Sequence, residues 1–218
     1  MPTTFQEIYT QFLSKIEDYE LGALTEIDAL ELLFSFMKSS IVDFKKCKQD
    51  INSFIPFTSN KFNINFNGGN SVSFISNLTM TNSNLVFEVY NGDTLLTQGV
   101  DYNLVIASSK GIITNISITK LNIELPDTLT IVWAFGGQFT VTLTLEEQEI
   151  LALGIVIAWL NHKILREQNL KQIIGDTDYK GFSPANLVAK LTTLQEQYSQ
   201  EIRTKRVSYS YNNFTGLN

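Results

Sequence analysis

Thr144 to Leu160 reads TLEEQEILALGIVIAWL, and this stretch decides the fold. Thr144, with Glu147 three residues later, forms a capping box, the reciprocal pairing that begins a helix. The segment that follows, Ile150 to Leu160, is apolar nearly all round, with Gly154 inside it. Because such a helix must be covered on several sides, we predict that it is the central helix of a helical body. A membrane span needs about 20 apolar residues, so no membrane segment is expected.

Two helices near the N-terminus offer apolar faces to the central helix. The first begins at a capping box of Thr4 and Glu7 and shows the i, i+3, i+4, i+7 spacing of one helix face. The second begins at Thr25, where Asp28 gives a near-match to the same motif. The apolar stripe of this second helix comprises Leu30, Leu33, Phe34, Met37 and Ile41.

A last helix follows the central one. Ser183 as N-cap and Pro184 at the first helical position are typical of a helix start. The apolar stripe behind them comprises Leu187, Leu191, Leu194, Tyr198 and Ile202. Residues 207–218, VSYSYNNFTGLN, carry no charge and no helix signal, so we expect an extended C-terminal tail. The helical body is therefore assigned to residues 1–56 and 144–206.

Residues 57–143 change to the period of two that is typical of strands. Asn91-Gly92 between two strand-like runs predicts a hairpin, because a type I′ turn needs positive φ at both central residues. Strands are expected at 62–66, 72–74, 85–90, 94–97, 102–107, 111–119, 128–135 and 139–143. Short strands at this spacing favour an antiparallel β-sandwich or barrel. The predicted fold class is α+β, with a β domain inserted into the helical body.

Charge is distributed unevenly along the chain. There are 16 Lys and Arg residues against 22 Asp and Glu residues, a net charge of −6, which argues against a general nucleic-acid binder. Residues 57–143 hold only 8 of these charged residues but contain 12 Asn and 11 Thr. The shortage of charge is therefore confined to the β insertion and the central helix.

Residues that suggest catalysis or metal binding are few. Cys47 is the one cysteine, which excludes an intramolecular disulfide, and it lies in a basic stretch of the kind that lowers a thiol pKa. His162 has no nucleophile or orienting acid at a recognisable spacing. Asp176 and Asp178 form Asp-x-Asp, but position twelve of a calcium loop would fall on Leu187 instead of Glu. We therefore expect no enzyme, no metal and no cofactor.

The order of the segments resembles the head–tail adaptor, or connector, proteins of tailed bacteriophages. Phe182–Leu187, the apolar stripe that follows and Arg203–Tyr211 look like the last helix and tail of that family. Val89–Gly92, Gly99–Tyr102 and Gly111–Ile113 are similar to small β modules that recur in phage structural proteins. The resemblance is architectural and covers most of the chain, and the large β insertion departs from the smallest adaptors.

This resemblance implies a four-helix adaptor-like body that forms a homo-oligomeric ring of about twelve subunits. The ring would be assembled in the host cytoplasm and would lie in the neck of the virion, between the portal protein and a stopper or tail-completion protein. Aromatic residues on a flexible tail can supply binding hot spots. The residues expected to dock on the portal are Arg203, Lys205, Arg206, Tyr209, Tyr211 and Phe214.

The ring would also let DNA pass, with no membrane as partner. An acidic channel wall repels phosphate, so that DNA slides through it. The candidate channel-lining residues are Glu26, Asp28 and Glu31.

The alternative hypothesis is a phage β-sandwich binding module, such as a collar, a baseplate part or a glycan-binding decoration. Exposed aromatic side chains can stack on sugars, although most strand aromatics belong to the core. The candidates are Tyr90, Tyr102, Trp133 and Phe135. A third hypothesis, an enzyme, would need a nucleophile or a metal-ligand set that the sequence does not show.

Overall fold

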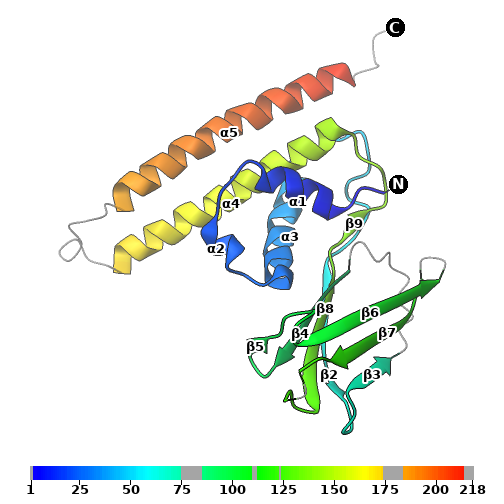
Figure 1. Cartoon of the computed structure of the whole chain (residues 1–218). Coiled ribbons are helices and arrows are strands. Elements are labelled where there is room, and N and C mark those ends of the chain that lie inside the picture. The colour runs from blue at the N-terminus through cyan, green and yellow to red at the C-terminus, as the bar shows by residue number, and fades with distance from the viewer. Residues whose placement is uncertain (1, 75–84, 110–111, 123, 174–183, 214–218) are drawn as a thin grey trace. The chain divides into compact units, whose positions relative to one another are not determined.

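The chain folds as a mixed α+β protein. The computed structural model describes residues 2–74, 85–109, 112–122, 124–173 and 184–213. Within these residues it contains five helices and three antiparallel sheets, and no sheet closes into a barrel. The chain divides into two compact units, drawn together in Figure 1. Unit 1 comprises residues 1–23, 31–54 and 139–218, and unit 2 comprises residues 24–30 and 55–138.

Three of the five helices in the described residues begin at the predicted capping motifs, namely α1 (Phe5–Leu13), α3 (Glu26–Asp43) and α4 (Leu145–Ile173). The other two are α2 (Tyr19–Gly22) and α5 (Pro184–Asn212). At the start of α1, the Thr4 hydroxyl accepts a hydrogen bond from Glu7 N at 3.3 Å. At the start of α3, Thr25 Oγ1 accepts one from Asp28 N at 3.2 Å. The short helix α2 was not predicted. The predicted N-cap Ser183 of α5 lies outside the described residues.

Helix α4 is the centre of unit 1. Its capping box is confirmed, because Thr144 N donates to Glu147 Oε2 at 2.8 Å and Glu147 N donates to Thr144 Oγ1 at 3.3 Å. Every residue from Ile150 to Val156 is buried. Helix α1 packs against α4, and α5 runs antiparallel beside it (Figure 1). The apolar surface of α4 is therefore covered from several sides, as the sequence predicts.

A longer apolar stretch of α4 also meets the length and composition of a membrane span. Leu145–Asn169 is the one such stretch in the described part of the chain, and its mean hydropathy reaches 1.2 in the most apolar window. Of that window, 56% is buried inside the protein. The stretch therefore has the burial of a core helix.

A cluster of phenylalanine rings joins the three chain segments of unit 1. Phe5 of α1 lies 5.7 Å from Phe34 of α3, ring centre to ring centre. The Phe5 ring also meets Phe139 edge-on at 4.9 Å and Phe54 at 5.8 Å. Because these residues are far apart in the sequence, the core of unit 1 forms only when both ends of the chain come together.

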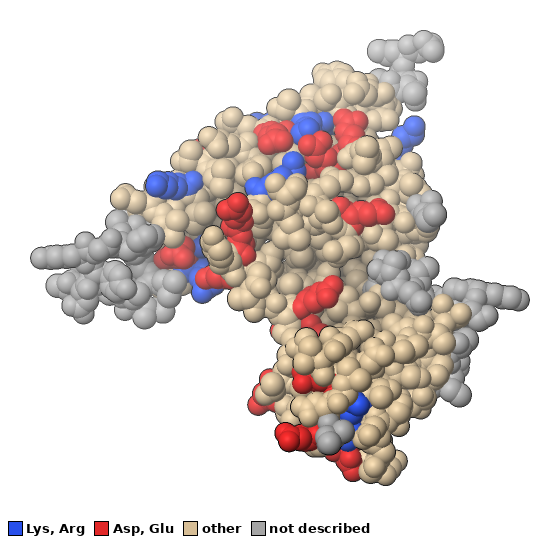
Figure 2. All heavy atoms as spheres, in the orientation of Figure 1, with Lys and Arg blue, Asp and Glu red and all other residues tan. Residues whose placement is uncertain are grey.

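Two sheets of unit 2 share one core. The first has the strand order β2 (Thr58–Asn65), β8 (Thr128–Phe135), β4 (Leu85–Asn91) and β5 (Thr94–Leu95). The second has the order β3 (Ser71–Phe74), β7 (Ile112–Lys120) and β6 (Tyr102–Ser109). Alternate side chains of both sheets enter a common cluster, which includes Ile64, Val89, Ile118 and Ile131. The face of this unit seen in Figure 2 is mostly uncharged, as its composition predicts.

A third, two-stranded sheet forms where the chain enters and leaves the insertion. It pairs β1 (Phe54–Ile55) with β9 (Gln138–Phe139). The predicted strand at 139–143 is therefore present only at its first residue. Beyond β9 the segment is bonded to Thr3, because Thr3 N donates to Val141 O at 3.0 Å and Leu143 N donates to Thr3 Oγ1 at 2.8 Å.

The predicted hairpin between β4 and β5 is present, but its turn differs. Asn91 pairs with Thr94, so Gly92 and Asp93 are the central residues. Gly92 has φ of +60°, and Asp93 is not among the residues with positive φ. Glycine with positive φ at the first central position is the type II′ pattern, not the predicted type I′.

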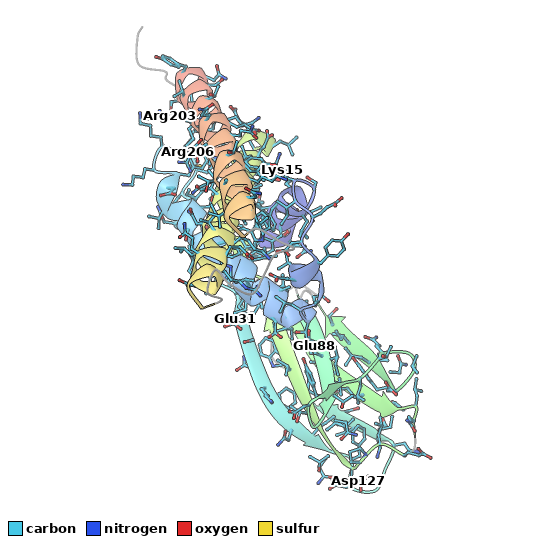
Figure 3. The ribbon with its side chains drawn as sticks, turned by 90° about the vertical axis from the view of Figure 1, so that its left-hand side faces the viewer. Lys15, Glu31, Glu88, Asp127, Arg203 and Arg206 are labelled. Carbon is cyan, nitrogen blue, oxygen red and sulfur yellow. The ribbon has the colours of Figure 1, made fainter. Side chains whose placement is uncertain are left out.

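A buried carboxylate places the start of α3 in unit 2. Glu88 of β4 is 6% exposed, and its Oε1 accepts a hydrogen bond from Ile27 N at 2.9 Å. The other oxygen accepts one from the Tyr90 hydroxyl at 2.7 Å. Glu88, labelled in Figure 3, thus satisfies one of the free N–H groups at this helix end. The sequence assigned residues 24–30 to the helical body, whereas the structure groups them with the β domain.

Helix α5 continues through most of the predicted tail. It ends at Asn212, so residues 207–212 are helical and not extended. Tyr209 is 2% exposed and meets the Phe44 ring edge-on at 5.4 Å. Packing of this kind outweighs the modest helix propensity of Val-Ser-Tyr-Ser-Tyr. Residues 214–218 of the tail lie outside the described residues.

Candidate functional site

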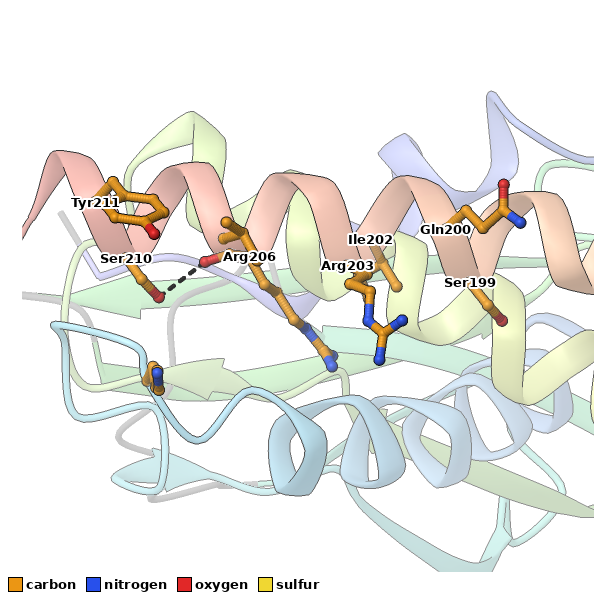
Figure 4. A pocket seen from close by; sticks show the side chains of 9 residues that line it. Ser199, Gln200, Ile202, Arg203, Arg206, Ser210 and Tyr211 are labelled. Atoms are coloured by element: carbon orange, nitrogen blue, oxygen red, sulfur yellow. Dashed lines mark hydrogen bonds between the residues drawn. The ribbon is translucent and has the colours of Figure 1, made fainter.

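A groove of about 870 Å³ runs along α5 in unit 1 (Figure 4). We call it the α5 groove. Its lining residues are Lys46, Ser199, Gln200, Ile202, Arg203, Arg206, Val207, Ser210 and Tyr211. Three of them are cations and none is an acid. The α5 groove therefore suits a partner that carries negative charge.

One face of α5 supplies most of this lining. Ser199, Arg203, Arg206 and Ser210 follow one another at spacings of four, three and four, which place them on one helix face. The side chains of Arg203 and Arg206 point from α5 across the groove toward α3 (Figure 4). Lys46 comes from the segment that follows α3. The groove is thus built from two chain segments that are far apart in the sequence.

Arg206 is the least exposed cation of the groove. Its Nε and Nη2 atoms are buried and have no hydrogen-bond partner within the described residues. The guanidinium carbon lies 5.9 Å from the centre of the Phe44 ring. Burial lowers the pKa of Arg206, and the nearby Asp43 opposes this. A buried donor without an acceptor costs about 1–3 kcal/mol, so this guanidinium carries a desolvation cost, which the charge of Asp43 partly offsets.

A buried carboxylate holds the C-terminal part of α5 in place. Glu147 Oε1 accepts hydrogen bonds from the Tyr209 hydroxyl at 2.5 Å and from Cys47 Sγ at 3.5 Å. Lys48 N donates to the Tyr209 hydroxyl at 2.8 Å. Burial acts to raise the pKa of Glu147, but the hydrogen bonds from Tyr209, Thr144 and Cys47 outweigh it and the pKa is lowered. We call this group the Glu147 anchor.

A second polar cluster holds the start of α2 against α4. Asp18 Oδ2 accepts a hydrogen bond from Trp159 Nε1 at 2.7 Å, and Oδ1 accepts one from Lys163 Nζ at 3.0 Å. Glu20 lies beside them and pairs with Lys163 at 2.5 Å and with Arg166 at 2.6 Å. Burial acts to raise the pKa of Asp18, but the hydrogen bonds and the charge of Lys163 lower it.

The lowered pKa of Asp18 makes stability depend on pH. Its contribution is complete above the unfolded pKa, about 4, and is lost as the pH falls through the lower folded pKa. We expect Asp18→Asn to lower the urea midpoint at about pH 7 and to flatten its fall between about pH 5 and about pH 3, measured by circular dichroism. Glu17→Gln, at an exposed neighbour, should keep the wild-type profile. An unchanged profile for Asp18→Asn would contradict this role.

The residues expected to dock on the portal do not all lie together in the structure. Arg203 and Tyr211 are exposed, and Arg206 is half-buried, so these three surround the α5 groove. Tyr209 is part of the Glu147 anchor, so the expectation of a mobile aromatic hot spot was wrong for this residue.

Lys205 and Phe214 do not join the three groove residues. Lys205 Nζ pairs with Glu149 Oε2 at 3.0 Å, on another side of α5. Phe214 lies outside the described residues.

The candidate channel-lining residues all lie near the start of α3. Glu26, Asp28 and Glu31 are exposed. Asp28 and Glu31 are three residues apart and share one face of the helix, and Glu31 is labelled in Figure 3. Their carboxylates are free to repel an approaching phosphate.

Two of the four candidates for sugar stacking are core residues. Tyr102 is 3% exposed and Phe135 is 1% exposed, because both side chains point into the protein from their strands. The proposed stacking role was wrong for these two. Tyr90 and Trp133 are half-buried, and the Tyr90 hydroxyl is already bonded to Glu88.

The remaining candidates do not form a reactive centre in the described residues. Burial and the adjacent Glu147 raise the pKa of Cys47 to about 11, which is opposite to the effect expected from its basic neighbours. His162 is exposed, and its ring lies 5.9 Å from Phe36. Asp176 and Asp178 lie outside the described residues. No cluster of three metal-ligating side chains occurs in the described ranges.

Sequence reasoning named Arg203 and Arg206 but missed the groove that they line. The spacing of Ser199 to Ser210 is a usable signal, provided the helix is extended past residue 206. Lys46 gives no such signal, because its approach depends on the tertiary fold. Comparison of the chain with protein-family models, with curated proteins and with solved structures finds no match.

Proposed function

We propose that the protein is a structural virion protein that forms a ring in the neck of a tailed phage. In this proposal the ring has about twelve subunits, joins the portal to the stopper or tail, and lets DNA pass. The four-helix adaptor-like body corresponds to unit 1, and unit 2 is the inserted β-sandwich. The protein acts through its surfaces and not as an enzyme.

The observation that carries the proposal is that the apolar face of α5 is only partly buried. Among its described side chains, only Ile202 and Tyr209 are buried. Of the rest of its apolar stripe, Leu187, Leu191 and Tyr198 are half-buried and Leu194 is 37% exposed. A helix of 29 residues with one partly covered apolar face is typical of an element that a neighbouring subunit completes.

The exposed acids at the start of α3 support the passage of DNA. Glu26, Asp28 and Glu31 carry no ion pair in the described part of the chain. A wall of unpaired carboxylates keeps DNA from adhering, because it repels the phosphate backbone.

Ring formation is the direct test of this proposal. We expect mass photometry and electron microscopy to show rings of about twelve subunits, for the full chain alone or with the portal protein of the same phage. A protein that stays monomeric in both samples would contradict the proposal.

Charge reversal of the channel candidates should make the ring retain DNA. Asp28→Lys combined with Glu31→Lys is expected to raise the affinity for a short DNA duplex at low salt by about tenfold or more, because each new cation can neutralise a phosphate. Gel mobility shifts at rising salt measure this. Glu196→Lys with Glu201→Lys makes the same charge change on exposed positions of α5 and is the matched control. If both variants bind DNA equally well, the start of α3 does not line the channel.

A further inference from the structure

The most exposed aromatic side chain among the described residues of unit 1 stands on a rigid support. Tyr19 begins α2 and is 92% exposed. Directly before it, Asp18 accepts a hydrogen bond from Glu20 N at 3.0 Å and is bonded to Trp159 and Lys163 of α4. An aromatic ring on a fixed backbone loses little conformational freedom when it binds. It is therefore suited to act as a binding anchor.

A free carboxylate lies next to this ring. Glu17 is exposed and has no hydrogen bond or ion pair in the described part of the chain. Tyr19 and Glu17 together form what we call the α2 tip. The α2 tip thus offers an apolar ring with one unpaired negative charge beside it.

The α5 groove has the complementary features. Ile202 and Val207 provide apolar wall, and Arg203, Arg206 and Lys46 provide positive charge. Arg203 and Lys46 are exposed and have no ion pair in the described part of the chain, so a carboxylate of a partner can pair with them. The volume of about 870 Å³ accommodates an aromatic side chain together with its neighbour.

The α2 tip and the α5 groove lie on different sides of unit 1. In Figure 1, α5 and α2 lie on opposite sides of α4, and in Figure 3 Arg203 and Arg206 lie on the edge away from Lys15. Two different surfaces that fit each other produce a head-to-tail contact, which closes into a ring when the rotation between subunits allows it. A two-fold dimer would instead need one self-complementary surface.

We propose that the α5 groove of each subunit receives the α2 tip of a second copy of this chain. Tyr19 lies against the apolar wall, and Glu17 pairs with Arg203 and Lys46. This inference rests on the proposed ring and names the two surfaces that join its subunits.

Mixing two defective variants tests the head-to-tail arrangement. Tyr19→Ser removes the tip, and Arg203→Glu reverses the charge of the groove. We expect each variant alone to need at least about ten times more protein than wild type to form rings. An equal mixture should give heterodimers and nothing larger, because only one intact tip–groove pair forms. Leu145→Ser, at an apolar residue that is 77% exposed and belongs to neither surface, should form rings normally.

Charge exchange and portal binding complete the test. Glu17→Arg combined with Arg203→Glu should form rings again, with circular dichroism used to show that every variant is folded. Normal rings from both single variants would overturn the inference and leave the proposed function standing. If Arg203→Glu forms rings but no longer binds the portal, the groove belongs to the portal and the inference is also overturned. A wild-type chain that is monomeric with and without portal overturns the proposed function.

Discussion

Replacing Glu147 with alanine is expected to lower the free energy of unfolding by about 3 kcal/mol. Glu147 is 1% exposed, and its carboxylate accepts hydrogen bonds from Tyr209, Cys47 and Thr144. Without it, the Tyr209 hydroxyl loses its acceptor in the interior of unit 1, and Thr144 N loses its acceptor at the part-buried start of α4. The start of α4 also loses its capping box. Urea unfolding followed by far-ultraviolet circular dichroism at neutral pH measures this loss.

Two further variants show whether the loss comes from the Glu147 anchor. Tyr209→Phe keeps the ring against Phe44 but removes one hydrogen bond, so we expect a loss of about 1 kcal/mol. When Glu147→Ala and Tyr209→Phe are combined, the two losses of stability should not add, because both residues act in one interaction. Glu201→Ala, at an exposed site on α5, should change stability little. A Glu147→Ala protein as stable as Glu201→Ala would disprove the anchor.

The sequence predicts those parts of the fold that depend on residues close together in the chain. The capping box of Thr144 and Glu147 needs only two residues three positions apart, and it is present as predicted. The end of α5 depends instead on Tyr209 meeting Glu147, 62 residues away in the chain. No local pattern reports such a contact, so the sequence ends this helix too early.

The site was predicted unevenly for a similar reason. Arg203 and Arg206 stand out by charge alone, but their common groove needs Lys46 from a distant segment. For Cys47 the sequence shows basic neighbours, whereas the fold buries the thiol against Glu147 and reverses the direction of the pKa shift. That Phe135 is aromatic and lies in a strand does not show which face of the sheet its side chain is on. The face decides whether the side chain belongs to the core or to a binding surface.

Gly154 is a residue whose importance only the structure explains. In the sequence it is an isolated glycine within an apolar helix. In unit 1 it lies against Ser40 of α3, whose Oγ donates a hydrogen bond to Leu151 O at 2.8 Å. A Cβ atom at Gly154 would overlap Ser40 Oγ and lie 2.8 Å from Ser40 Cβ. The glycine therefore permits the close approach of α3 and α4.

Gly154→Ala should accordingly destabilise the protein by about 3 kcal/mol, because α3 must move away from α4. The expected sign is opposite to that of helix propensity alone, which favours alanine over glycine by about 1 kcal/mol. Adding Ser40→Gly removes both overlapping atoms and leaves Ser40 Cα at 3.2 Å, so more than half of the loss should be recovered. Gly22→Ala has no atom within 4 Å of the new Cβ and is the matched control. Urea midpoints for the four proteins decide the matter: if Gly154→Ala equals or exceeds wild type in stability, the helices are not packed at this contact.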